Sequence, residues 1–155
     1  MIKKILLTVN SHSAGSGDES SSKVKSNYEK AVTIIKSAKK YEKKDKLEKA
    51  KKRYEKAQAL LIKSNKKKPL QADTLNYLGF TTRKLGDYEN GEKYYLLGLE
   101  INPNHVGINE YLGELYVATN RLDLAKERLK ILESCGCEEY TELKEIIEGT
   151  KKSKY

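Results

Sequence analysis

The chain has 155 residues, of which 37% are hydrophobic, so it is large enough for one domain with either a compact core or a short stack of repeats. It carries a net charge of +9 and contains no run of about 20 apolar residues, which excludes a membrane-spanning helix. Only two prolines are present and alternating runs of β-branched residues are missing, which predicts an all-α fold.

Residues 1–22 do not share the pattern of the rest of the chain. Lys3 and Lys4 precede a short apolar run at residues 5–9, and a Ser- and Gly-rich stretch follows at residues 11–22. This order is typical of a secretory signal, although the apolar run is shorter than the usual length of about 7 to 15 residues. Two interpretations stay open, which are a degenerate signal-like segment and a disordered tail.

The region from residue 31 to residue 139 repeats one pattern of small and large side chains three times. The pattern in the second copy is Gly79, Gly86, Tyr88, Gly91 and Tyr95. A shift of 34 residues toward the C-terminus gives Gly113, Asn120, Leu122, Ala125 and Leu129. A shift of 41 residues toward the N-terminus gives Ala38, Asp45, Leu47, Ala50 and Tyr54. The first copy therefore contains seven additional residues, which is about two helical turns.

Each copy is predicted to form a helix, a tight turn and a second helix. At the turn of the second copy, Gly86 can adopt the left-handed conformation that ends a helix, and Asp87 can cap the next helix. Gly79 and Gly91 lie inside helical patterns, where a glycine costs about 1 kcal/mol relative to alanine. We therefore expect these glycines where helices pack closely. Large positions of the pattern predict core tyrosines, which are Tyr41, Tyr54, Tyr88, Tyr95 and Tyr116.

This spacing resembles the tetratricopeptide repeat (TPR), a 34-residue unit of two helices. In the unit that starts at Ala72, the resemblance rests on Leu75, Leu78, Gly79, Tyr88, Gly91, Tyr95, Gly98 and Pro103. The resemblance implies units at residues 31–71, with the insertion, 72–105 and 106–139, arranged as a short right-handed α-solenoid of three helical hairpins. Small exported TPR proteins of Gram-negative bacteria look similar overall, which favours an exported, periplasmic location over a cytoplasmic one.

A last amphipathic helix is predicted at residues 138–148. Its apolar side consists of Tyr140, Leu143, Ile146 and Ile147. Stacked repeats expose an apolar face at each end, so we expect this helix to cap the solenoid. The TPR domain then covers residues 23–149, and residues 150–155 are expected to form a frayed basic tail.

In TPR proteins the first helix of each unit lines a concave groove that binds peptides. Carried over by position, the groove residues are Lys36, Lys39 and Lys43 in the first unit, Asn76, Tyr77, Phe80, Arg83 and Lys84 in the second, and Glu110, Tyr111 and Glu114 in the third. We expect the aromatic side chains to bury apolar area and the charged ones to set the register of the partner. A variant of the family clamps the C-terminal carboxylate of chaperone peptides. Only one of its five positions here, Lys39, has the expected residue type, so that partner is not expected.

The positive charge gathers near the N-terminal end of the repeats. Residues 23–68 contain 18 Lys or Arg against 5 Asp or Glu, whereas residues 69–155 contain 11 against 15. Such a block can bind nucleic acid or an anionic membrane surface. The lysines can equally lie on solvent faces of helices, and the absence of interleaved base-stacking aromatics favours this second interpretation. Self-association through the third unit or the extended first unit is a further alternative.

The sequence shows no catalytic constellation. His12 lies in the Ser-rich segment, His105 lies between units, and no Ser-His-acid set or phosphate-binding loop can be placed. Cys135 and Cys137 can act as a redox pair, bind a soft metal with other ligands or close a small ring, but two ligands are too few for structural zinc. The favoured interpretation is that they are two small residues in the turn before the last helix. We therefore expect a non-catalytic module without cofactor or metal that binds a protein or peptide.

Overall fold

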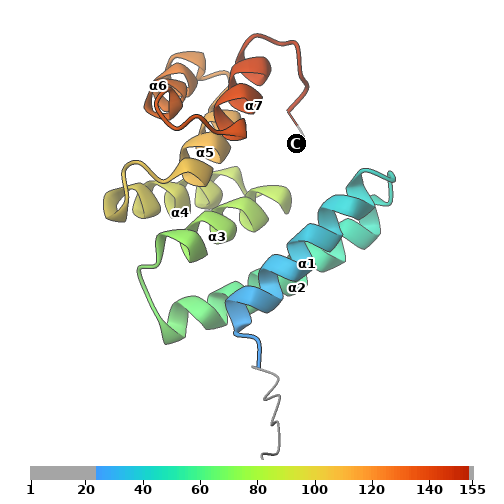
Figure 1. Cartoon of the computed structure of the whole chain (residues 1–155). Coiled ribbons are helices and arrows are strands. Elements are labelled where there is room, and N and C mark those ends of the chain that lie inside the picture. The colour runs from blue at the N-terminus through green and yellow to red at the C-terminus, as the bar shows by residue number, and fades with distance from the viewer. Residues whose placement is uncertain (1–23, 154–155) are drawn as a thin grey trace, which may run out of the picture.

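The structure, a computed structural model, describes residues 24–153, and within this range it contains seven helices and no strand. The helices are α1 (Asn27–Glu42), α2 (Leu47–Lys67), α3 (Ala72–Lys84), α4 (Tyr88–Ile101), α5 (Val106–Ala118), α6 (Leu122–Leu132) and α7 (Glu138–Ile147). They form three hairpins, α1–α2, α3–α4 and α5–α6, stacked in chain order with α7 against the last one (Figure 1). The predicted all-α solenoid is confirmed. The signal-like segment at residues 1–22 lies outside the described residues.

A residue in the left-handed conformation makes the turn inside each hairpin. The φ angle is +54° at Asp45, +96° at Gly86 and +58° at Asn120. These three residues occupy the same position of the repeat pattern, and Gly, Asn and Asp are the residue types that tolerate this conformation best. The carboxylate of Asp87 accepts a hydrogen bond from the backbone N–H of Asn90 and caps α4, as predicted. The period read from the sequence is therefore the period of the backbone.

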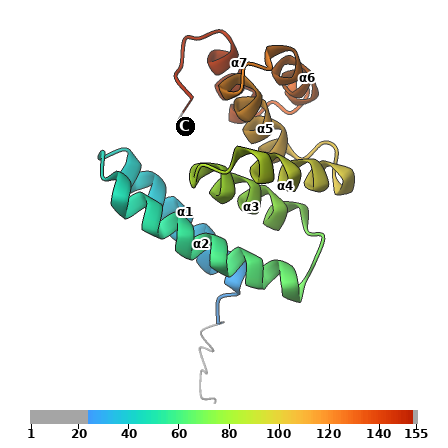
Figure 2. The same cartoon turned by 180° about the vertical axis from the view of Figure 1, so that it is seen from behind.

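The first hairpin is longer than the other two. Helix α2 has 21 residues, whereas α4 has 14 and α6 has 11. The difference between α2 and α4 equals the seven additional residues of the first copy, so these residues lengthen a helix and do not form a loop. Figure 2 shows the α1–α2 hairpin extending past the end of α3 and α4.

Small residues lie where neighbouring helices touch. A Cβ atom added to Gly79 would lie 2.5 Å from Cε1 of Tyr95, and one added to Gly113 would lie 2.5 Å from Cδ2 of Leu143. Carbon atoms in contact are about 3.5–4.0 Å apart, so neither site has room for a methyl group. Helix α4 therefore approaches α3 closely at Gly79, and α7 approaches α5 closely at Gly113.

The predicted core tyrosines have different outcomes. Tyr54, Tyr95 and Tyr116 are buried, and Tyr41 is half-buried. The prediction for Tyr88 is wrong, because 38% of this residue is exposed. Tyr88 is the first residue of α4, and its equivalents Leu47 and Leu122, which begin α2 and α6, are exposed as well. This position of the repeat lies at the end of each hairpin, where water reaches the side chain.

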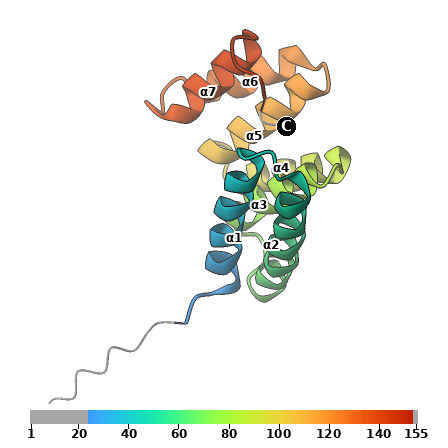
Figure 3. The same ribbon diagram turned by 90° about the vertical axis from the view of Figure 1, so that its right-hand side faces the viewer.

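Helix α7 covers the end of the stack. Leu143 and Ile146 are buried, while Glu138 and Lys144 are exposed. Figure 3 shows α5, α6 and α7 together at one end of the molecule and the α1–α2 hairpin at the other. In the loop between α6 and α7, Cys135 and Cys137 form a disulfide. The favoured interpretation of them as two small turn residues is therefore corrected, and the ring closure that the sequence left as an alternative is the one observed.

Candidate functional site: the inner face of the solenoid

The first helices of the three hairpins meet on one side of the solenoid. Lys39 Nζ of α1 donates a hydrogen bond to the Tyr111 hydroxyl of α5 at 3.0 Å and lies 4.6 Å from the ring centre of Phe80 on α3. The ring centres of Phe80 and Tyr111 are 4.9 Å apart. We call the surface that α1, α3 and α5 form around these residues the inner face. Because α1 reaches α5 directly, the stack is tightly curled here.

The eleven predicted groove residues fall into two groups. The accessible group comprises Lys36 and Lys43, which are exposed, and Lys39, Tyr77 and Tyr111, which are half-buried. The buried group comprises Asn76, Phe80, Arg83, Glu110 and Glu114, together with Lys84, whose side chain is 7% exposed. The expectation that all of these side chains line an open groove is therefore corrected. The neighbouring first helices pack over the second group, which supports the inner face from within the molecule.

Arg83 and Glu114 form a buried ion pair between α3 and α5. Arg83 Nη2 lies 3.2 Å from Glu114 Oε2, and the two side chains are 1% and 2% exposed. Arg83 Nη1 also donates to the backbone oxygen of Tyr111 at 2.7 Å. Removing one partner of such a pair would leave an uncompensated buried charge, which is strongly destabilising. We expected these charges to set the register of a partner, but in the folded chain they join the second hairpin to the third.

Lys84 makes the corresponding connection to the first hairpin. Its ammonium forms an ion pair with Glu42 at the end of α1, and Glu42 Oε2 accepts a hydrogen bond from the Tyr54 hydroxyl at 2.8 Å. Burial lowers the pKa of Lys84, and the nearby Glu42 carboxylate opposes that shift. Lys84 therefore serves the packing of α3 against the α1–α2 hairpin.

A shallow pocket of about 270 Å³, which we call the acidic pocket, lies between α5 and α7. Its lining residues are Glu110, Tyr111, Glu138, Glu139 and Glu142. Burial, reinforced by Glu114 and Glu142, raises the pKa of Glu110 to about 9, which favours the protonated form of this carboxyl group. The α7 carboxylates were not among the predicted site residues, because the groove positions were carried over only for the first helices of the three units and the predicted cap helix was given no binding role.

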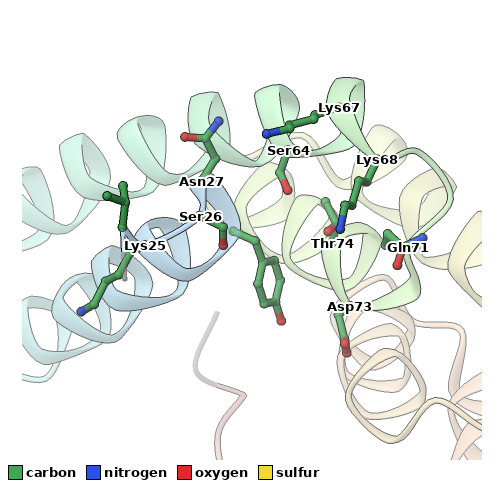
Figure 4. Close-up of a pocket in the computed structure, with 11 residues that line it drawn as sticks. Lys25, Ser26, Asn27, Ser64, Lys67, Lys68, Gln71, Asp73 and Thr74 are labelled. Atoms are coloured by element: carbon green, nitrogen blue, oxygen red, sulfur yellow. The ribbon is translucent and has the colours of Figure 1, made fainter. Parts of the chain in front are cut away.

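A larger pocket of about 560 Å³ lies where the start of α1, the end of α2 and the start of α3 meet (Figure 4). Its lining residues are Val24, Lys25, Ser26, Asn27, Tyr28, Ser64, Lys67, Lys68, Gln71, Asp73 and Thr74. The ring centre of Tyr28 is 6.1 Å from that of Tyr77, so this pocket adjoins the inner face. Sequence reasoning missed Tyr28 because it precedes the first repeat unit, although its place on an amphipathic helix was a usable signal.

The described residues offer no metal site, since no three His, Cys, Asp or Glu side chains among them are arranged to hold an ion. His105 Nδ1 accepts a hydrogen bond from the backbone N–H of Ile108 and caps α5, and its Nε2 lies 2.9 Å from Asp73 Oδ1. His105 therefore has a structural place between the hairpins. Between residues 24 and 153, no helix is both long and apolar enough to cross a bilayer.

Comparison with known proteins finds a match for one repeat unit of the chain and for its fold. The family model "Tetratricopeptide repeat" matches residues 72–105, the bounds predicted for the second unit. No curated protein matches the chain. The NMR structure of the first TPR domain of the human RPAP3 protein is 20% identical with a TM-score of 0.57, over 77% of this chain and 91% of that one. A structure described as the first TPR of Spaghetti (RPAP3) bound to the HSP90 peptide SRMEEVD is 20% identical with a TM-score of 0.49, over 82% of this chain and 98% of that one.

These comparisons show the architecture and do not extend to the alternative functions. None of them supports binding to nucleic acid or to a membrane surface, and these alternatives stay predictions. The likeness to the human RPAP3 domain, at 20% identity, shows a shared fold. Together, the repeat match and the shared fold make this chain an all-α helical-repeat solenoid that contains a tetratricopeptide repeat at residues 72–105.

Proposed function

We propose that the protein is a non-catalytic interaction module that binds a peptide or protein segment along its inner face. One observation carries this proposal: the accessible part of the inner face combines aromatic rings with positive charge. Tyr77 and Tyr111 are half-buried, while Lys36 and Lys43 are exposed about one helical turn on either side of Lys39. Aromatic side chains flanked by charges are typical anchors of protein interfaces.

The buried contacts beneath this surface support the same proposal. The Arg83–Glu114 ion pair and the hydrogen bond from Lys39 to Tyr111 fix α1, α3 and α5 relative to one another. A surface that is already ordered loses little conformational freedom when it binds, so more of the contact energy appears as affinity. The inner face therefore has the preorganisation that recognition of a flexible segment requires.

The test uses the full chain as bait in an extract of its native cell, identifies the captured partner by mass spectrometry, and then measures binding with purified components. Tyr77→Ala, and separately Lys36→Glu with Lys43→Glu, are expected to weaken binding about tenfold or more, or about 1.4 kcal/mol. The control is Lys51→Glu with Lys56→Glu, the same charge change at exposed positions of α2. If the two double lysine variants weaken binding equally and Tyr77→Ala does not change it, the partner does not bind along the inner face.

We also propose export, as the segment at residues 1–22 suggests. The disulfide between Cys135 and Cys137 supports it, because disulfides persist chiefly in oxidising compartments. Sequencing the N-terminus of the protein purified from its native cell tests the idea. A start near Ser11, Ser13 or Ala14 is expected, whereas a start at Met1 or Ile2 contradicts cleavage.

A further inference from the structure

After α7 the chain turns back at Gly149. Gly149 has a φ angle of +73°, in the left-handed region, and its N–H donates to the backbone oxygen of Ile146. The N–H groups of Thr150 and Lys151 both donate to the backbone oxygen of Glu145, at 3.0 and 3.1 Å. This is the arrangement by which a left-handed glycine ends a helix and reverses the chain. In Figures 1 and 2 the chain after α7 returns toward the α1–α2 hairpin.

Residues 150–153, which we call the strap, then contact both α7 and α5. Lys151 Nζ donates to Glu142 Oε1 at 3.0 Å and lies 3.7 Å from Glu145 Oε2. Ser153 Oγ lies 3.5 Å from Glu114 Oε2 on α5. The side chains of Lys151 and Glu142 are 33% and 18% exposed, so their ion pair is partly shielded from water.

The strap contacts the same acids that border the inner face. Glu142 lines the acidic pocket together with Glu110 and Tyr111, and Glu114 belongs to the buried pair with Arg83. A lysine-rich segment beside several carboxylates is complementary in charge, and the complete tail, residues 150–155, contains three lysines and no acid. The protein therefore places a basic segment of its own at the α5–α7 end of the surface that we propose for binding.

We propose that the strap is an intramolecular competitor, which occupies the α5–α7 end of the inner face and is displaced when a basic segment of a partner binds there. This inference rests on the proposed function and names its partner class, a Lys- or Arg-rich segment. Displacement exchanges one lysine–carboxylate contact for another, so a partner that offers a single basic residue gains little binding free energy over the strap. A partner with further contacts to Tyr77 or Tyr111 displaces the strap, because those contacts add binding free energy that the strap does not have.

The test uses a synthetic peptide with the sequence of residues 149–155, GTKKSKY, and full-length protein in two forms. One form is unchanged, and the other carries Lys151→Gln with Ser153→Ala, which removes the contacts of these two side chains with Glu142, Glu145 and Glu114. Amide chemical shifts followed by NMR detect even millimolar affinity. At equal peptide concentration, shifts around Glu114, Glu142 and Glu145 are expected to be at least threefold larger in the variant. In the variant, the further changes Glu142→Gln with Glu145→Gln are expected to abolish the peptide-induced shifts. The change Glu148→Gln in the same variant, at an exposed acid of the same region, is expected to leave these shifts unchanged.

Equal shifts in the two forms, or no shifts in the variant, would overturn the strap as a competitor. A peptide in which all three lysines are replaced by glutamine controls for nonspecific binding and should leave both forms unshifted. Thermal unfolding checks that each variant is folded. Because the probe is the protein's own sequence, the result does not depend on the partner, so failure of the strap and failure of the proposed function are distinguished.

Discussion

Burial explains why charged side chains of α3 form ion pairs within the molecule. Arg83 and Lys84 are adjacent basic residues of α3, yet one pairs with Glu114 in the third hairpin and the other with Glu42 in the first. Both are removed from water, where an unpaired charge would be costly, so each needs the partner it has. The residue types on the inner face were visible in the sequence, but their pairing was not.

Glu110 offers a test at this scale, because its protonation links stability to pH. Its pKa is raised in the folded state, by burial first and by Glu114 and Glu142 second, so the folded protein binds more protons than the unfolded one between about pH 4.5 and about 9. The free energy of unfolding therefore falls as the pH rises through this window. Glu110→Gln removes this contribution, since the amide keeps a hydrogen-bond donor and never ionises.

We expect the stability gain of Glu110→Gln to be about 1–3 kcal/mol larger at pH 8 than at pH 5. Urea unfolding followed by circular dichroism at the two pH values measures it. Glu148→Gln, an exposed substitution of the same kind, should give the same result at both pH values. A gain from Glu110→Gln that does not change with pH would show that Glu110 is ionised in the folded protein.

The packing within a helix pair depends on the positions at which the backbone of one helix can closely approach the other helix. Within the second hairpin, Gly79 of α3 faces Tyr95 of α4, and Gly91 of α4 lies against the backbone of α3. The turn between these helices uses a left-handed glycine, while the equivalent turns use Asp45 and Asn120. The same helix-turn-helix unit is thus built three times, with residues that share size or conformational tolerance and differ in identity.

Gly79→Ala tests this close contact, since helix propensity and packing predict opposite signs. Alanine in a helix is more favourable than glycine by about 1 kcal/mol, which alone would stabilise α3. The added methyl group would overlap the fully buried ring of Tyr95, and overpacking of this kind costs about 1–3 kcal/mol. We expect net destabilisation, measured as a lower midpoint in thermal unfolding. A higher midpoint would mean that α3 and α4 are not in close contact at Gly79.

The whole molecule is a short stack whose two ends differ. Helix α7 closes the C-terminal end, and the lengthened α2 belongs to the hairpin at the other end. Between the ends, the hydrogen bond from Lys39 to Tyr111 joins α1 to α5, so the first and third hairpins are in direct contact. The hairpins are therefore connected across the inner face as well as from each hairpin to the next.

Leu143→Ala probes the contribution of the cap to this stack. Leu143 is fully buried against Gly113, and truncating a buried leucine costs about 2–5 kcal/mol. Thr141→Ala, an exposed change on the same helix, is expected to lie within about 0.5 kcal/mol of the unchanged protein. Chemical unfolding of the two variants compares them. Similar stabilities would mean that α7 does not seal the end of the repeats.

The sequence by itself determined the helical class, the 34-residue period, the turn positions and the terminal cap, because each depends on local size and conformational preferences that recur along the chain. It also indicated which helices form the inner face. Only the tertiary structure decided that Phe80, Arg83 and Glu114 are buried, that α7 adds carboxylates beside Glu110, and that Lys151 returns to Glu142. These outcomes depend on how tightly the hairpins curl and on contacts between residues far apart in the chain, which leave no periodic trace in the sequence.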